Sequence, residues 1–334
     1  MAVILVGMLY YLMGIGETIV YRERMQDAAD SGAFAAAVIH ARGMNVIALM
    51  NNVMAAVLAV LVVLKVVEDL LTAAVIIATA ICALPFGAGA WACPLAALLE
   101  VGREYTSSVI EGVEPTVETI VDATNAVSSA VRTVYPIAAQ YKVTETGFDT
   151  YDPPTTRGFM VPLLEPLPVE EDDSSLLCKK AGEQAGRIIG TVIGLWPIRR
   201  FVGTAVGGLA STFASHYCGD SADKAFRVEE DAELGDENFQ LRSIMFGDAP
   251  FDDNEAGVKV ATFGQDGSDS LSAFKSFGEI SFAQAEFYYD GDVDRKDWMW
   301  HMRWRARLRR FTIPSSIPGL GGINLNVLDE AIVH

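Results

Sequence analysis

The first 100 residues contain three apolar runs that are separated by short polar intervals. The first run, MAVILVGMLYYLMGIG, covers 1–16 and would be about 24 Å long as a helix, a little less than the roughly 20 residues that span a bilayer. From Glu17 the chain keeps helical spacing, because small apolar residues recur at intervals of three and four. The pattern therefore predicts one long helix over 1–42 that runs outward from membrane depth.

Two further apolar runs, Met44–Leu64 and Leu70–Leu84, each allow two interpretations. One is a transmembrane span, and the other is a helix buried among other helices. The alanine content fits both, because small side chains let helices approach closely in lipid and in protein alike. The polar residues that interrupt or separate the runs are Asn45, Asn51, Asn52, Lys65, Glu68 and Asp69.

The cysteines nearest the N-terminus flank a segment that must turn. Cys82 and Cys93 enclose CALPFGAGAWAC, which has proline and glycine at its centre. A disulfide between them would close the tip of a helical hairpin. The chain has four cysteines, and no Cys-x-x-Cys or Cys/His cluster suggests zinc. Disulfides in an oxidising compartment are the better interpretation.

Residues 95–142 return to helical spacing, with Pro115 and Pro136 as expected kinks or breaks. We interpret 46–148 as an apolar helical hairpin region. The next segment, 149–175, contains five prolines and too little periodicity for a helix, so it predicts a linker.

A glycine at every fourth residue marks the helical region 176–220. Each glycine costs about 1 kcal/mol of helix propensity relative to alanine, so the stripe predicts a partner backbone lying against it, and we assign it to assembly. Trp196–Pro197 would end this helix, and a second helix would bring Cys178 and Cys218 together at the open end of a hairpin. We predict that disulfide. The stripe consists of Gly182, Gly186, Gly190 and Gly194.

From 221 to 334 the period changes, and we interpret this part as an acidic β-rich surface domain. Strands are predicted over 257–264, 279–289 and 298–311. In the last run large apolar residues alternate with arginines, so one face is apolar and the other carries guanidinium groups. We expect this row to meet carboxylates of its own chain or of a neighbouring copy, and we assign it to assembly. The row consists of Arg303, Arg305, Arg307 and Arg309.

The composition excludes several classes of protein. With 51% hydrophobic residues, 20% charged residues and a mean hydropathy of +0.28, the chain is too apolar for an ordinary soluble pair of domains. Part of its surface is therefore expected to meet lipid or other copies. Its formal net charge of −18 repels phosphate backbones, so no nucleic acid partner is expected. The predicted fold class is α+β: a long apolar N-terminal helix and helical hairpins followed by a small antiparallel sheet.

The sequence offers little that could converge into a catalytic site. Its four histidines are far apart, with no His-x-x-x-His or Gly-x-Ser-x-Gly spacing, so we expect no enzyme and no cofactor. Asp290, Asp292 and Asp294 match positions 1, 3 and 5 of a calcium loop. The glycine and the glutamate that complete such a loop are missing, so an acidic turn is the better interpretation than a metal site.

Glu17 is the most informative single acid, because it lies at the edge of the first apolar run. A carboxylate at membrane depth is costly and usually has a partner there. In a bundle of N-terminal helices, a terminal amine or an arginine of a neighbour would pair with it. The alternative is an interfacial residue beside Arg22 and Arg24.

The string RERMQDAADSGAFAAAVIHARGMN, directly after the apolar run, resembles the start of TadE/TadG-like proteins of tight-adherence (Tad) pilus systems. In those proteins a motif close to Leu/Met-Gln-Asp-Ala-Ala-Asp-Ala-Ala-Ala follows the helix, and Met25–Ala33 corresponds to it. The similarity covers 1–45, with a weaker one over 283–311. It implies a pilin-like N-terminal helix that inserts into the inner membrane before assembly.

Two functional hypotheses follow. The first is a structural subunit of an extracellular, Tad-like pilus, filament or tubule at the cell surface. Its apolar Ala/Gly-rich helices would polymerise with copies of the same chain and with other pilin-like subunits. The second is a membrane-anchored accessory protein of pilus assembly with an extracytoplasmic α+β domain.

Overall fold

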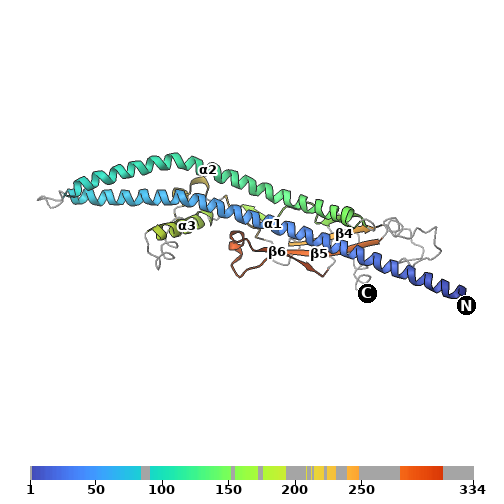
Figure 1. The fold of residues 1–334 in the computed structure, drawn as a ribbon. Coiled ribbons are helices and arrows are strands. Elements are labelled where there is room, and N and C mark those ends of the chain that lie inside the picture. The colour runs from blue at the N-terminus through green and yellow to red at the C-terminus, as the bar shows by residue number, and fades with distance from the viewer. Residues whose placement is uncertain are drawn as a thin grey trace.

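Two long antiparallel helices and a small sheet form an elongated molecule, with the N-terminus at one end and a helical hairpin at the other (Figure 1). The fold class is α+β, as predicted. The computed structural model describes residues 2–83, 91–151, 155–171, 176–192, 208, 212, 214–221, 224–230, 239–247 and 279–310.

Helix α1 (Ala2–Cys82) runs without interruption for 81 residues, or about 120 Å. The prediction that the first helix ends near residue 42 is wrong, and the predicted boundary at residue 45 lies inside α1. The polar interval near Lys65 does not break the helix either. Lys65 pairs with Glu114 of the neighbouring helix at 2.6 Å, so this interval is a contact on the helix surface.

Helix α2 (Ala92–Glu145) returns alongside α1 and continues through Pro115 and Pro136, where a break or kink was expected. A single-turn π-helix, η2 (Thr146–Thr150), follows it. The Cys82–Cys93 disulfide joins the two long helices, which confirms the predicted pairing and the chain reversal between them.

The sheet is antiparallel, with strand order β1-β4-β5-β6. Strand β5 has the predicted bounds. The run predicted as a strand over 298–311 is a 3-10 helix, η6 (Arg295–Trp300), and then a strand only from Trp304, because Trp300 packs into the core between the helices. The strands are β1 (Thr155–Val161), β4 (Gln240–Gly247), β5 (Glu279–Tyr289) and β6 (Trp304–Arg309).

The segment 149–175, predicted to be a linker, contains two strands instead. Strand β1 lies at the edge of the sheet, where neighbouring prolines are tolerated because one side of the strand needs no ladder partner. Strand β2 (Val169–Glu171) pairs with β3 (Phe226–Val228) in a second, two-stranded sheet. The strand predicted over 257–264 lies outside the described residues.

Three short helical elements complete the described structure. They are α3 (Leu176–Val192), α5 (Ala214–Tyr217) and the 3-10 turn η4 (Gly219–Ser221).

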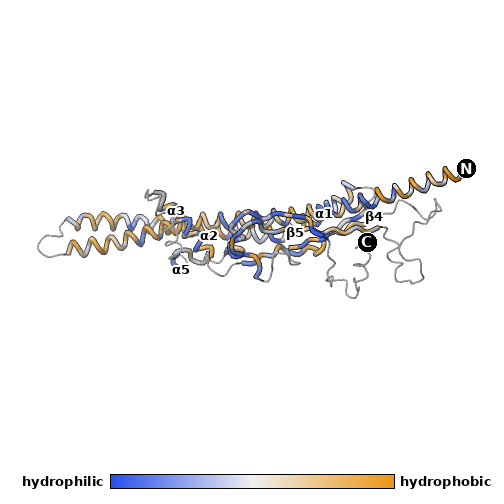
Figure 2. The backbone as a smooth tube through the Cα atoms, turned by 90° about the horizontal axis from the view of Figure 1, so that it is seen from below, coloured by the Kyte–Doolittle hydropathy of each residue, from blue (hydrophilic) through white to orange (hydrophobic). Residues whose placement is uncertain are grey.

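Two apolar cores lie along α1. The first joins α1 from Tyr21 to Ile47 with the end of α2 and one face of the four-stranded sheet. The second joins α1 from Met54 to Val62 with the middle of α2 and with α3. The body of the molecule is therefore centred on residues 21–62 of α1, and both ends of this helix extend beyond it (Figure 2).

Candidate assembly surfaces

The motif at Met25–Ala33 brings α1 close to the sheet. Met25, Ala28 and Ala29 are fully buried in the first core. A Cβ atom added at Gly32 would lie 2.6 Å from the Cε atom of Met245 in β4, so no larger residue fits without a shift. In this chain, the small residues of the motif thus allow α1 to pack closely against the sheet.

Side-chain amides of α1 bind main-chain groups of segments far away in the sequence. The amide nitrogen of Asn51 donates to the carbonyl oxygens of Phe226 at 2.8 Å and Met299 at 3.1 Å. Its Oδ1 accepts from the N–H of Phe226 at 3.1 Å. Asn45 pairs in the same way with Trp304, donating to its carbonyl at 3.0 Å and accepting from its N–H at 3.1 Å.

These bonds decide between the two interpretations of Met44–Leu64. A membrane span would have no use for amides that pair with main-chain groups of strands, and the run is covered by α2, α3 and η6 of its own chain. The structure therefore supports the buried helix. Shelter for the middle of α1 comes from within the chain, whereas the first hypothesis expected it from neighbouring copies.

The glycine stripe packs within the same chain where it is described. Gly182 and Gly186 are buried in α3, whose Ala181 and Ala185 pack into the second core with α1. Gly190 belongs to α3, and Gly194 lies outside the described residues. Burial within the chain leaves the first two glycines unavailable to a second copy.

The disulfide between Cys178 and Cys218 forms as predicted and ties α3 to the short helix α5. A second helix was predicted before Cys218. The described residues of this stretch include the short helix α5. Trp196–Pro197, where the first helix was expected to end, lies outside the described residues.

The arginine row on β6 meets carboxylates of its own chain, one of the two partners expected for it. Arg307 and Arg309 both contact Glu286 of β5, at 3.0 and 2.5 Å, and Glu286 is only 1% exposed. Arg305 pairs with Asp290 at 2.9 Å. The carbonyl oxygen of Arg303 accepts from the N–H of Asp290. The row therefore links β6 to β5 and its turn.

The three aspartates considered for a metal lie in the loop between β5 and η6. Asp290 is occupied by Arg305, and the carbonyl oxygen of Asp294 accepts from the N–H of Asp297 at 2.8 Å. Asp292 is exposed. Across the described residues, no group of three or more His, Cys, Asp or Glu is arranged to hold a metal ion.

A cavity of about 100 Å³ lies between α1, the proline-rich segment and the sheet, with room for a few water molecules. His40 lines it, and Nδ1 of this ring contacts the carbonyl oxygen of Ala36 at 3.0 Å. Burial lowers the pKa of His40 to about 4, so the ring is neutral near pH 7. Burial also raises the pKa of Glu229, which lines the same cavity and pairs with Arg132.

Sequence reasoning missed this cavity, because its residues are spread over almost 250 positions. His40 was one of four isolated histidines, and nothing near it in the sequence indicates that Glu229 and Phe287 lie beside it.

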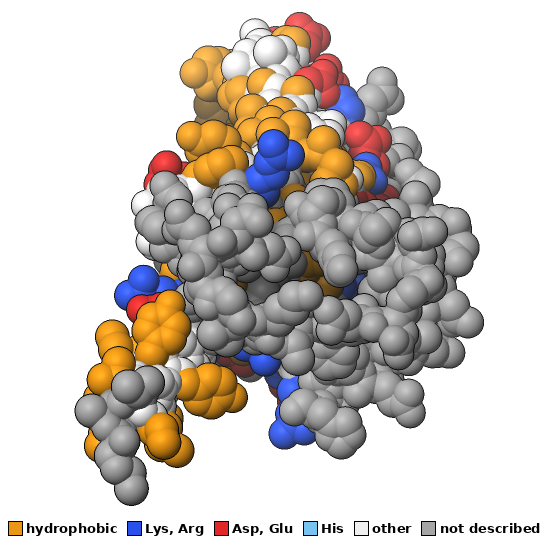
Figure 3. Space-filling model, turned by 90° about the vertical axis from the view of Figure 1, so that its right-hand side faces the viewer, with side chains coloured by type: hydrophobic (Ala, Val, Ile, Leu, Met, Phe, Trp, Pro, Cys, Tyr) orange, Lys and Arg blue, Asp and Glu red, His pale blue; other side chains and the backbone are white. Residues whose placement is uncertain are grey.

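The first bare surface is the N-terminal part of α1, which extends beyond the body (Figure 2) and exposes hydrophobic side chains on the face drawn in Figure 3. Glu17 is exposed there, and no hydrogen bond or ion pair joins it to another described residue. Its partner in a neighbour remains a prediction. The exposed apolar residues include Ile4, Leu5, Val6, Met8, Leu9, Tyr10, Tyr11, Leu12, Met13 and Ile15.

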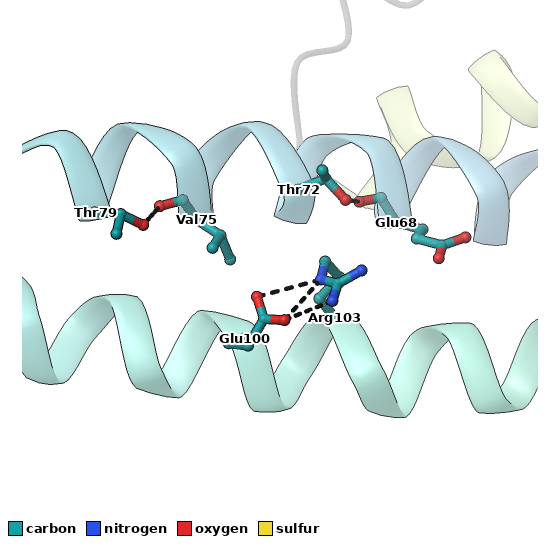
Figure 4. Close-up of polar contacts among 6 residues, drawn as sticks. All are labelled: Glu68, Thr72, Val75, Thr79, Glu100 and Arg103. Atoms are coloured by element: carbon teal, nitrogen blue, oxygen red, sulfur yellow. Dashed lines mark hydrogen bonds and ion pairs between the residues drawn. The ribbon is translucent and has the colours of Figure 1, made fainter.

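The second bare surface is the hairpin at the opposite end, where α1 and α2 have only each other as neighbours among the described residues (Figures 1 and 2). Polar groups here are satisfied locally, as Figure 4 shows. The hydroxyls of Thr72 and Thr79 donate to carbonyl oxygens one turn earlier in α1. Arg103 pairs with Glu100 at 2.5 Å within α2, at the inner border of the apolar part.

The chain has one described helix, α1, that is long and apolar enough to cross a membrane. Comparison with known protein families, curated proteins and solved structures finds nothing that matches the chain.

Proposed function

We propose that this chain is a pilin-like structural subunit of an extracellular, Tad-like filament, and that the N-terminal part of α1 holds it in the membrane before assembly. One observation carries the proposal: a single helix is sheltered by its own body from Tyr21 to Val62 and is bare over Ile4–Val20.

A helix that is hydrophobic on all sides is stable only in lipid or among other apolar helices. Burying each large apolar side chain of Ile4–Val20 would contribute about 1.5–3 kcal/mol, and the chain itself offers no described element to bury them. Lipid supplies this shelter to a single molecule, and the helices of sister copies supply it in a filament. The same segment would therefore be buried in lipid before assembly and among the helices of neighbouring copies in the filament.

Two disulfides support a location of the body outside the cytoplasm. Disulfides persist in oxidising compartments and are rare in the cytosol. With the body on the oxidising side, the N-terminal part of α1 would enter the membrane from that side. The resemblance of Met25–Ala33 to the TadE/TadG-like motif is consistent with this orientation.

A second candidate, a permanently anchored accessory protein of pilus assembly, is favoured by a different observation. The middle of α1 finds its partners inside the chain, through Asn45, Asn51 and the sheet. Such a body needs no neighbouring copies for its own stability. Both candidates share the membrane-inserted stage and differ in where the mature protein resides.

Fractionation of cells that produce the full-length chain separates these candidates. Material sheared from the surface and cleared of membranes should contain the protein if it is a filament subunit. Recovery of the protein exclusively in the membrane fraction would contradict the proposal and favour the accessory protein.

A matched pair of variants sharpens this result. Leu9→Lys places a charge on the bare segment, whereas Leu49→Lys places one at an exposed position of α1 within the body. The first is expected to remove the protein from both the membrane and the sheared fraction, and the second to leave it in both. Equal behaviour of the two variants would show that the bare segment has no special role.

A further inference from the structure

The hairpin tip, defined as Leu70–Cys82 of α1 and Ala92–Leu99 of α2, is an apolar surface that the described body leaves uncovered. The sequence has no charged residue between Asp69 and Glu100. Ile76 is 64% exposed, Ile77 61% and Leu98 69%. Monomeric proteins rarely expose contiguous apolar patches of this kind without a partner.

Lipid is a poor partner for the hairpin tip. On the α2 side, Glu100 follows only eight residues after Ala92 begins the helix, a distance of about 12 Å against a hydrocarbon core of about 30 Å. The chain reverses between Cys82 and Cys93, whose Cα atoms are 5.0 Å apart. Inserted from its charged border, the tip would place this reversal inside the hydrocarbon. The hydrocarbon core disfavours a chain reversal, because it has no water to satisfy main-chain groups outside a helix or a closed barrel.

The chain itself contains a protein surface that matches the hairpin tip. The N-terminal segment, defined as Ile4–Gly16, has 13 residues without a charge, and so has the α1 side of the tip. Both are therefore about 20 Å long. Atoms added at Gly7 or Gly14 would meet nothing within 4 Å, so the N-terminal segment has room for a close helical neighbour.

The two surfaces of one molecule cannot meet each other. Residues 17–69 of α1 separate them, and as continuous helix these span about 80 Å. Contact must therefore be made between different copies. Because the two surfaces lie at opposite ends of one rod, such contacts can repeat head to tail, and they give an open filament when the rotation between neighbours does not close.

We infer that the hairpin tip is the docking site for the N-terminal segment of a second copy of this chain. The inference rests on the proposed function and specifies the contact by which subunits join. Each copy would use its tip to cover the bare helix of the next copy, and the Glu100–Arg103 pair would mark the inner border of the contact.

Photo-crosslinking in cells tests the contact directly. A benzophenone amino acid replaces Ile77 in the full-length chain, and in a matched control it replaces Ile137, which is 54% exposed on α2 beside the body. The expected product is a dimer whose crosslinked peptide contains residues of the N-terminal segment, from the tip position alone. Adducts with lipid only, with another protein only or with a different part of the chain would overturn the inference.

A second measurement tests the contact without the benzophenone amino acid, which could itself disturb the packing at position 77. Ile76→Lys is expected to lower the amount of protein in sheared surface material about tenfold or more, because the lysine loses its water in an apolar contact. Ile137→Lys should leave that amount unchanged. Membrane insertion and formation of the Cys82–Cys93 disulfide report that each variant is folded.

The two proposals fail in different ways. If wild-type chain is missing from the sheared fraction, the filament is refuted, whatever the crosslinks are. If wild-type filaments form and the Ile77 probe marks no residue of the N-terminal segment, or Ile76→Lys assembles normally, only the docking contact is refuted.

Discussion

The middle of α1 and its two ends differ in both composition and surroundings. Tyr21–Val62 contains six charged residues, whereas Ile4–Gly16 and Leu70–Cys82 contain none. From Tyr21 to Val62 the helix is packed by its own chain, whereas Ile4–Gly16 and the hairpin tip are bare. The difference lies in a few polar and small residues. Asn45 and Asn51 bind main-chain groups, and Gly32 admits the sheet, while the ends have no equivalent contacts among the described residues. In α1 the uncharged stretches are the ones left bare, and the stretch that contains polar side chains is the one that its own chain packs.

Removing each disulfide in turn is expected to show the largest difference in stability between the body and the hairpin tip. Replacing Cys178 and Cys218 by serine opens a loop of 40 residues and should lower the free energy of unfolding of the body by about 4 kcal/mol. Replacing Cys82 and Cys93 should leave the unfolding of the body unchanged, because that bond lies in the bare tip. Urea titration followed by tryptophan fluorescence measures both. Equal loss in the two variants would mean that tip and body unfold as one unit.

Asn51→Ala tests whether side-chain amides hold the middle of α1 in the body. The substitution leaves three buried main-chain contacts unmade, so the free energy of unfolding should fall by about 3 kcal/mol or more. Thr72→Val in the tip is the control, since the hydroxyl there only supplements a helical carbonyl. It should change stability by less than about 0.5 kcal/mol. A small loss in Asn51→Ala would contradict the assigned role.

His40 makes the stability of the body depend on pH. Its folded pKa of about 4 lies below the ordinary value of 6.5, so between these values the unfolded chain binds the proton more readily. Stability is therefore complete above pH 6.5 and falls by up to about 3 kcal/mol as the pH drops to 4. Unfolding titrations of wild type and His40→Leu at several pH values measure this loss.

In His40→Leu the fall in the free energy of unfolding between pH 6.5 and 4 should be absent. In His301→Gln, which changes an exposed histidine, this fall should remain. Glu165 and Glu229 line the same cavity, and the raised pKa of Glu229 acts in the opposite direction. The difference between wild type and His40→Leu isolates the histidine. An unchanged slope in His40→Leu would show that the ring titrates normally in the folded protein.

Alanine substitutions at two glycines, one in the body and one in the bare N-terminal segment, are expected to show the smallest difference in stability. An alanine at Gly32 would press on Met245 and Ser243, and its better helix propensity offsets part of this cost, so the free energy of unfolding should fall by about 1 kcal/mol. Gly14→Ala adds a methyl group in open space and should cause no loss, because alanine favours the helix by about 1 kcal/mol. Thermal unfolding of the two variants compares them. A tolerated alanine at position 32 would mean that the helix and sheet are less closely packed than the structure indicates.

Local patterns predicted the features that depend on neighbouring residues. The β-like run over 279–289 predicted β5, the Pro/Gly segment predicted the first hairpin, and the places of the cysteines in the two expected hairpins predicted both disulfides. The arginine row was expected to meet carboxylates, and Glu286 and Asp290 provide them.

Features that depend on distant contacts were missed. The polar residues near 42 and 65 suggested helix breaks, because their partners on α2 and the sheet lie far away in the sequence. The role of Asn51 could not be predicted for the same reason, since it binds residues 175 and 248 positions away. Strand β1 was hidden in a proline-rich segment, where only its place at the edge of the sheet makes a strand acceptable.

Electron cryo-microscopy of sheared native material tests most directly the claim that the bare ends of α1 are sheltered by sister molecules. We expect a helical filament in which Ile4–Gly16 of each subunit is covered by protein while Tyr21–Val62 remains packed against the sheet of its own chain. Isolated subunits whose N-terminal helix lies permanently in a bilayer would contradict it.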